Sequence, residues 1–304
     1  MSAITFILLG LIFGLCNTCV LHLAKAMERH GIEIFSRDKT LKEKGKKPLI
    51  YIVGLVLNNM VFIWQFLGLT FSSAAVFSSV FGVGLVVLML YSYFILHEEI
   101  SRPELIGAIL IIIGTTMVGV LYIIEPPVQE NLIYNNFFTL LIIIALISLV
   151  LITISVKAGI GVAFIFGAIA GTFGGMDNVF KRIGFKSLGF FDAFLGVFRL
   201  EMDSFIFLFS FLCGFLAFFI TQLGFAKGAD ASKLVPMYNS FYIIGPILFE
   251  LIIFENATIS LSKIIAIAII VIGIFMMNLF MNPEQLHVVE LEEEMEPPLK
   301  NEEN

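Results

Sequence analysis

Charged side chains are scarce in this chain of 304 residues, of which only 14% are Asp, Glu, Lys or Arg. Soluble globular domains carry about one quarter charged residues. Hydrophobic residues make up 59% of the sequence. These proportions exclude an ordinary soluble domain and indicate an integral membrane protein.

Cysteine and catalytic motifs are also nearly missing. The three cysteines, Cys16, Cys19 and Cys213, lie in apolar runs, and an odd number without zinc-ligand spacing favours neither a disulfide framework nor a metal site. We expect them to pack as small apolar side chains. The sequence holds none of the common serine-hydrolase, zinc-protease or nucleotide-binding motifs. We therefore expect no enzyme, no cofactor, no ATP-driven pump and no nucleic-acid partner.

Long apolar runs dominate what is present. The clearest is the uncharged stretch "FFTLLIIIALISLVLITISV", residues 137–156, which is long enough to cross a bilayer as a helix. The pattern predicts an all-α integral membrane protein with about nine transmembrane helices. The predicted spans are 3–24, 49–69, 73–96, 105–123, 137–156, 160–180, 204–226, 234–254 and 264–281.

Basic residues predict the orientation of the spans. The loop after span 1, counted with Lys25, holds eight Lys and Arg residues, and such loops stay in the cytoplasm. This places the N-terminus outside and the C-terminus inside. The last stretch, 282–304, carries eight acidic residues and one lysine, so we expect a disordered cytoplasmic tail. A partner for this tail and a homodimer both remain open.

One sparse pattern occurs twice. The stretches "GLIFGLCNTCVLHLAK" (10–25) and "GTFGGMDNVFKRIGFK" (171–186) both read G-x3-G-x2-N-x7-K. A glutamine follows in the next span of each copy, and a glutamate follows 33 residues after each glutamine. The matched pairs are Asn17 and Asn178, Gln65 and Gln222, Glu98 and Glu255, and Gly114 and Gly273.

We interpret the two copies as four-helix units. The predicted organisation is a first four-helix repeat over 1–123, a linking span 5 over 124–159, a second repeat over 160–281 and the tail over 282–304. Because five spans separate equivalent helices, the second copy is inverted in the membrane. Inverted repeats are typical of secondary transporters, which bind solute between the repeats near the membrane midplane.

Glycines in both copies share a helix face with the repeated asparagine. Small residues let membrane helices approach closely, so we expect helix packing along these faces. The glycines concerned are Gly10 and Gly14 in span 1, and Gly167, Gly171 and Gly175 in span 6.

Polar residues inside spans are candidates for solute binding, because they are costly in lipid. The predicted substrate-binding residues are Asn17, Asn58, Asn59, Gln65, Asp177, Asn178, Gln222, Tyr238, Asn239 and Glu250. Asp177 is also the candidate metal ligand, since a carboxylate beside a carboxamide suits a hard cation. The alternative is an ion pair with Lys181, four residues further on. Pro236 and Pro246 predict an interruption of span 8, either a broken helix that lines a cavity or an ordinary kink.

Another stretch, 183–203, fits neither a span nor an ordinary loop. It is either an amphipathic helix at the outer interface or an aromatic loop packed on the spans.

Two stretches resemble known families. The stretch "YSYFILHEEISRPELIGAILIIIGTTMVGV" (91–120) resembles the end of an EamA-type repeat of the drug/metabolite transporter superfamily, with His97 where a glycine is usual. The nine-span layout and "KLVPMYNSFYIIGPILFE" (233–250) resemble the NIPA family of magnesium transporters, although Phe62 stands where that family has an acid in span 2.

These resemblances imply a transporter that works by alternating access. The leading substrate is Mg²⁺ or another divalent cation. The alternative is a small organic metabolite or drug, and a third hypothesis is a non-transporting membrane scaffold or receptor.

Overall fold

Helices account for the regular structure in the computed structural model, which describes residues 3–35, 44–71, 77, 80–125, 131–255 and 257–279. Within these residues, seven helices are long and apolar enough to cross a membrane. Two shorter apolar helices cover Phe81–Leu96 and Leu261–Met276. The prediction of an all-α multi-pass membrane protein is confirmed.

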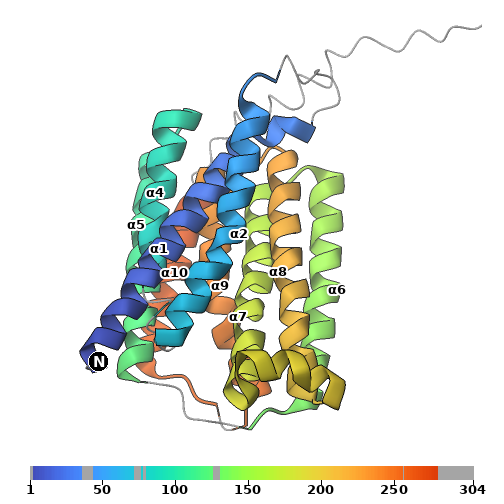
Figure 1. Ribbon diagram of the computed structural model, residues 1–304. Helices are drawn as coiled ribbons and strands as arrows, with labels where there is room; N and C mark the ends of the chain where they lie inside the picture. The colour runs from blue at the N-terminus through green and yellow to red at the C-terminus, as the bar shows by residue number, and fades with distance from the viewer. Residues whose placement is uncertain are drawn as a thin grey trace, which may run out of the picture.

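The helices form one bundle (Figure 1). Each predicted span has a helical counterpart, although most of the start of span 3 lies outside the described residues. The α-helices are α1 (Ala3–His30), α2 (Lys47–Phe71), α4 (Gly84–Tyr91), α5 (Arg102–Ile124), α6 (Tyr134–Ala158), α7 (Val162–Leu195), α8 (Met202–Ala226), α9 (Ala231–Ile253) and α10 (Leu261–Leu279). Short turns of 3-10 or π-helix are η1 (Ile32–Phe35), η2 (Phe81–Val83), η3 (Ser92–Leu96) and η4 (Gly196–Arg199).

Two helices extend beyond their predicted ends. Helix α1 continues to His30, six residues past the predicted end of span 1. Lys25 and Glu28, which were assigned to the basic loop, therefore lie within a helix and are buried. Helix α7 continues to Leu195 and is followed by η4, so most of the stretch 183–203 is helical. Figure 1 shows this part at the lower end of the bundle, beside the start of α8.

Equivalent helices of the two copies pack in matching pairs. Helix α1 packs against α2 and α4, and α7 packs against α8 and α9. In Figure 1, α1 rises from the labelled N-terminus whereas α7 descends, so the two run in opposite directions.

The last helices of the two copies, α5 and α10, pack against each other. A methyl group at Gly114 on α5 would lie 3.0 Å from the carbonyl oxygen of Ala266, and one at Gly273 on α10 would lie 2.7 Å from that of Gly107. The glycines that end the repeated series therefore face each other's helix reciprocally. Such close backbone contact ties the two halves together along this pair.

Helix α9 is continuous despite two internal prolines. The predicted interruption of span 8 as a broken helix is therefore wrong: Pro236 and Pro246 lie within an unbroken helical segment. The ring of Pro246 packs at Gly175 of α7, where a Cβ would lie 2.5 Å from its Cγ.

His97 stands at the position where the pattern of the stretch 91–120 usually has a glycine. Its backbone adopts a left-handed conformation with φ of 55°. A residue with a Cβ is strained there by about 1 kcal/mol. We expect His97→Gly to raise the free energy of unfolding by about 0.5–1 kcal/mol. Thermal unfolding of the purified protein measures this, with Glu99→Gly, which lacks the positive φ, as the control. A lower melting temperature for His97→Gly than for the control would contradict the prediction.

A matched pair of glycines tests the packing of α7 on α9. A Cβ at Gly171 would overlap the carbonyl oxygen of Tyr238, whereas one at Gly245 would meet only ordinary contacts, the nearest at 3.5 Å. We expect Gly171→Ala to lower the free energy of unfolding by about 2 kcal/mol, since backbone must shift. Gly245→Ala is expected to leave it unchanged or raise it by up to about 1 kcal/mol. Equal melting temperatures for the two variants would contradict this account.

Candidate functional site

Two polar clusters, one mostly buried and one partly buried, lie where α1 and α2 meet α7, α8 and α9. The first, called the Glu28 cluster, consists of Lys25, Glu28, Tyr51, Asn58 and Gln222. The second, called the Asp177 cluster, consists of Gln65, Asp177, Asn178, Lys181 and Tyr242. Each combines a carboxylate, an ammonium group, a tyrosine and carboxamides, and each contains residues from both copies of the repeat.

The Glu28 carboxylate is the centre of its cluster and is fully buried. Asn58 donates to one carboxylate oxygen at 3.0 Å, and Gln222 donates to the other at 2.5 Å. The hydroxyl of Tyr51 donates to the side-chain oxygen of Gln222 at 3.1 Å. Lys25 precedes Glu28 by one helical turn. The carboxylate is thus held from both sides, by α2 of the first copy and α8 of the second.

The Asp177 cluster contains an ion pair within α7. The ammonium nitrogen of Lys181 lies 2.6 Å from a carboxylate oxygen of Asp177. Both side chains are largely buried, with relative exposures of 9% and 13%. Gln65 of α2 donates to the side-chain oxygen of Asn178 at 2.5 Å, and Asn178 donates to the hydroxyl of Tyr242. This cluster therefore joins α2 of the first copy to α7 and α9 of the second.

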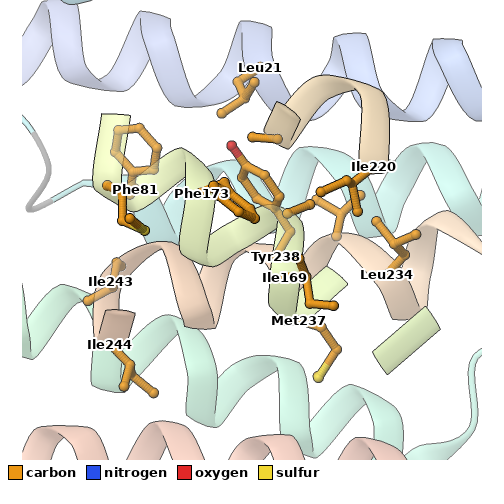
Figure 2. Packing of buried hydrophobic residues seen from close by; sticks show 14 of the residues in the cluster. Leu21, Phe81, Ile169, Phe173, Ile220, Leu234, Met237, Tyr238, Ile243 and Ile244 are labelled. Atoms are coloured by element: carbon orange, nitrogen blue, oxygen red, sulfur yellow. The ribbon is translucent and has the colours of Figure 1, made fainter. Parts of the chain in front are cut away.

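Aromatic rings of α9 connect the two clusters. The ammonium nitrogen of Lys25 lies 3.4 Å from the ring centroid of Tyr238, a cation–π contact. One turn further on, Tyr242 lies 5.7 Å from Tyr238 between ring centroids and stacks on Phe81 at 5.0 Å. Figure 2 shows Tyr238 between Phe173 and Ile169, with its hydroxyl directed toward the helix that carries Leu21. The polar clusters thus flank an aromatic layer.

Five of the ten predicted substrate-binding residues fall into these clusters. The structure brings together Asn58 and Gln222 in one, and Gln65, Asp177 and Asn178 in the other, with Tyr238 between them. The carboxylate of Asp177 faces Lys181, which is the alternative that the sequence left open. Among the residues that the structure describes, no group of three His, Cys, Asp or Glu side chains is placed to hold a metal ion.

Apart from Tyr238, four predicted residues lie outside both clusters. Asn59 is exposed and donates to the carbonyl oxygen of Leu55 on its own helix at 2.7 Å. Asn17 and Asn239 are buried, and neither the side-chain oxygen of Asn17 nor either polar atom of the Asn239 carboxamide has a hydrogen-bond partner in the structure. Glu250 lies eight residues beyond Tyr242, roughly 12 Å further along the helix axis.

The predictions missed five residues of the clusters as binding candidates. These are Lys25, Glu28, Tyr51, Lys181 and Tyr242. The repeated pattern itself contains Lys25 as its last member. Glu28 lies 18 residues after Gly10, which is five whole turns of helix, so it continues the Gly10–Gly14–Asn17 face. This extension of the face is the signal that could have found it.

Comparison with known proteins identifies part of the chain. Residues 1–120 match the EamA-like transporter family. No curated protein and no solved structure matches the chain. The EamA-like segment covers α1, α2, α4 and most of α5, so it includes Lys25, Glu28, Tyr51, Asn58 and Gln65. The remaining cluster residues lie beyond it, in the part of the sequence that carries the second copy of the pattern.

Proposed function

We propose that this protein is a secondary carrier of the drug/metabolite transporter type that moves a small polar organic solute. The two copies of the repeat would rock against each other and expose the site between them to each side in turn. The two polar clusters and the aromatic layer between them would bind the solute. The EamA-like segment, the inverted helix directions and the matched packing pairs all support this proposal.

The observation that carries it concerns the two repeated glutamines. Gln65 reaches across to Asn178 of the second copy, and Gln222 reaches across to Glu28 of the first copy. The hydrogen bonds between the halves therefore involve residues that the duplication places symmetrically. A site built in this way changes whenever the halves move, which couples binding to alternating access.

The geometry favours an organic solute over a metal ion. Mg²⁺ prefers several oxygen ligands, usually with carboxylates among them. The ammonium group of Lys181 already neutralises Asp177, and Lys25 lies one turn from Glu28. Ammonium, carboxylate, carboxamide and aromatic groups together suit a solute that carries its own hydrogen-bonding groups and an apolar part.

Magnesium or another divalent cation is the competing substrate. Its support is the Glu28 carboxylate between two carboxamides, whose oxygens are suitable ligands if the amide groups turn. Under this alternative Lys25 would have to move away from the site. The NIPA resemblance of the sequence belongs to the same alternative.

A matched pair of neighbouring asparagines tests the site. Asn58 donates to Glu28, whereas Asn59 is exposed and bonds only within α2. The purified protein is screened by thermal stability against Mg²⁺, other divalent cations and a panel of polar metabolites. A ligand at 100 times its dissociation constant stabilises by about 2.7 kcal/mol. Uptake of the ligand found is then measured in proteoliposomes for Asn58→Leu and Asn59→Leu.

Each outcome of these measurements supports one of the proposed functions or argues against the site. A metabolite-induced shift, with uptake lost in Asn58→Leu and retained in Asn59→Leu, supports the organic carrier. A shift with Mg²⁺ that disappears in Asn58→Leu supports the cation carrier instead. Equal uptake in both variants would mean that the solute does not bind at Glu28. Binding without uptake would favour a receptor or scaffold.

The basic end of the bundle would face the cytoplasm, with the N-terminus outside. The distribution of Lys and Arg in the sequence supports this orientation. Labelling of a cysteine introduced at Lys46 with a membrane-impermeant reagent in intact cells tests it. Rapid labelling would place residue 46 outside the cell and contradict this orientation.

A further inference from the structure

The first turn of α9 is held by a residue from the other copy of the repeat. The carboxylate of Glu98 accepts hydrogen bonds from the backbone amides of Ala231 and Ser232, both at 2.9 Å. These two residues are buried. Asp230, which occupies the N-cap position of α9, makes no side-chain capping bond. Glu98, which is distant in the sequence, therefore supplies the cap that a helix usually obtains from its own N-cap residue.

The local backbone aims Glu98 at α9. The π-helix η3 ends at Leu96, and the left-handed His97 then reverses the chain. The amide of Glu98 donates to the carbonyl oxygen of Ser92 at 3.1 Å, which fixes this reversal. The carboxylate is directed at the positive end of the α9 dipole, where a negative charge is favourable.

Ion pairs add further links at the same place. Arg29 at the end of α1 lies 3.9 Å from Asp230, and Lys233 lies 3.1 Å from Asp230. Lys233 also lies 3.9 Å from Glu104 at the start of α5. Three elements of the first copy thus converge on the first turn of α9.

Arg29, Glu98 and Asp230 border a cavity at this end of the bundle, the upper end in Figure 1. The cavity has a volume of about 530 Å³. Its lining includes Arg29 and His30 of α1, Glu98 and Glu99 after η3, and Asp230 before α9. The cavity therefore lies over the seam between the two copies, beside the end of α1 that carries Lys25 and Glu28.

The glutamate that the repeat equates with Glu98 makes different contacts. Glu255 accepts a bond from the side chain of Asn131 at 3.5 Å, and its backbone amide donates to the carbonyl oxygen of Asn131. Residue 131 precedes α6, so this contact does not reach the first copy. The same residue of the repeat is therefore used in two ways, as expected if the halves hold two different conformations.

We propose that Glu98 and the amides of Ala231 and Ser232 form a latch, here called the α9 latch, that closes this end of the transport path. Opening this end separates the first turn of α9 from η3 and from the end of α1. The close contact between α5 and α10 persists as the pivot. This inference rests on the proposed carrier function and assigns its gate on the cavity side.

Cysteine accessibility tests the latch without a substrate. The three native cysteines are replaced by alanine, and one of two reporters is introduced. Ser232→Cys reports on the latch itself, and Leu21→Cys reports on the buried layer near Tyr238. Labelling by a small hydrophilic thiol reagent is then compared for the parent, for Glu98→Gln and for Glu99→Gln, all as folded, purified full-length protein.

Glu98→Gln retains one acceptor oxygen and loses the charge, so one buried amide loses its partner. We expect both reporters to be labelled about tenfold faster, as the loss of a charge-assisted hydrogen bond predicts. The control Glu99→Gln borders the same cavity, and its rates are expected to equal those of the parent. If only Ser232→Cys reacts faster, Glu98 merely caps a fraying helix and the latch is overturned. Unchanged labelling of both reporters overturns it too.

A second variant covers the case that Glu98→Gln does not fold. Glu98→Asp keeps the charge but shortens the side chain by one methylene, so it cannot reach both amides. Faster labelling of Leu21→Cys in this variant supports the latch, and the parent rate contradicts it. Because no solute is added, a failed transport assay with faster labelling would refute the carrier and leave the conformational change intact.

Discussion

Asp177→Asn is expected to lower the free energy of unfolding by about 3 kcal/mol, because it leaves the buried ammonium group of Lys181 without its counter-charge. The ion pair is short and lies largely out of solvent. Removing one partner of such a pair is more costly than removing both. Thermal or denaturant unfolding of the purified protein in one detergent measures the loss.

The double variant separates charge pairing from function. We expect Asp177→Leu with Lys181→Met to regain most of the stability, since an apolar pair of similar size needs no counter-charge. Transport is expected to stay lost in the double variant. A double variant that is as unstable as Asp177→Asn would contradict the pairing. The pair of the exposed Arg199 and the half-buried Glu201 is the control: Arg199→Gln is expected to cost at most about 1 kcal/mol.

The same variants separate the two substrate classes. If Asp177 holds a cation, Lys181→Met removes a competing charge, and the thermal shift with Mg²⁺ should grow. If the pair belongs to the binding site of an organic solute, Lys181→Met abolishes that solute's thermal shift and leaves Mg²⁺ without effect. The two outcomes exclude each other.

The repeated pattern marked the polar residues of the clusters as candidates but missed most of the charged ones. A carboxamide inside a membrane favours a hydrogen bond with another helix, and the repeat marked Gln65, Asn178 and Gln222 as candidates without indicating their partners. Gln65 indeed bonds to Asn178. The same logic distinguishes two neighbours: Asn58 lies seven residues from Gln65 on one helix face, whereas Asn59 lies on the next face and satisfies its own amide within the helix.

The prediction that put charged residues of α1 in a loop failed for a physical reason. Hydropathy ends a span where charge begins, so Lys25 and Glu28 were counted with the loop. Whether a charged turn is solvated or buried depends on neighbours that are distant in the sequence, here Gln222 of α8 and Tyr238 of α9. The start of α9 shows the same limit, because nothing local indicates that Glu98 caps it.

Glu28→Gln is expected to reduce transport at least tenfold and to lower the free energy of unfolding by about 2 kcal/mol. The carboxylate accepts from Asn58 and Gln222 with its two oxygens. A glutamine offers only one acceptor oxygen, and its amide group would face another amide donor. One buried donor is then left unsatisfied, and the link between α1 and α8 is weakened. Uptake in proteoliposomes and thermal unfolding measure the two effects.

Lys25 distinguishes a structural from a functional role of this carboxylate. In the double variant Lys25→Met with Glu28→Gln both charges are gone, so we expect part of the stability to return. Transport should remain lost, because Tyr238 no longer has the ammonium group over its ring and the solute no longer meets a charge. Recovery of transport with stability would mean that Glu28 serves only the fold. Loss of transport at restored stability would instead place Glu28 in the path that the solute takes between the two halves.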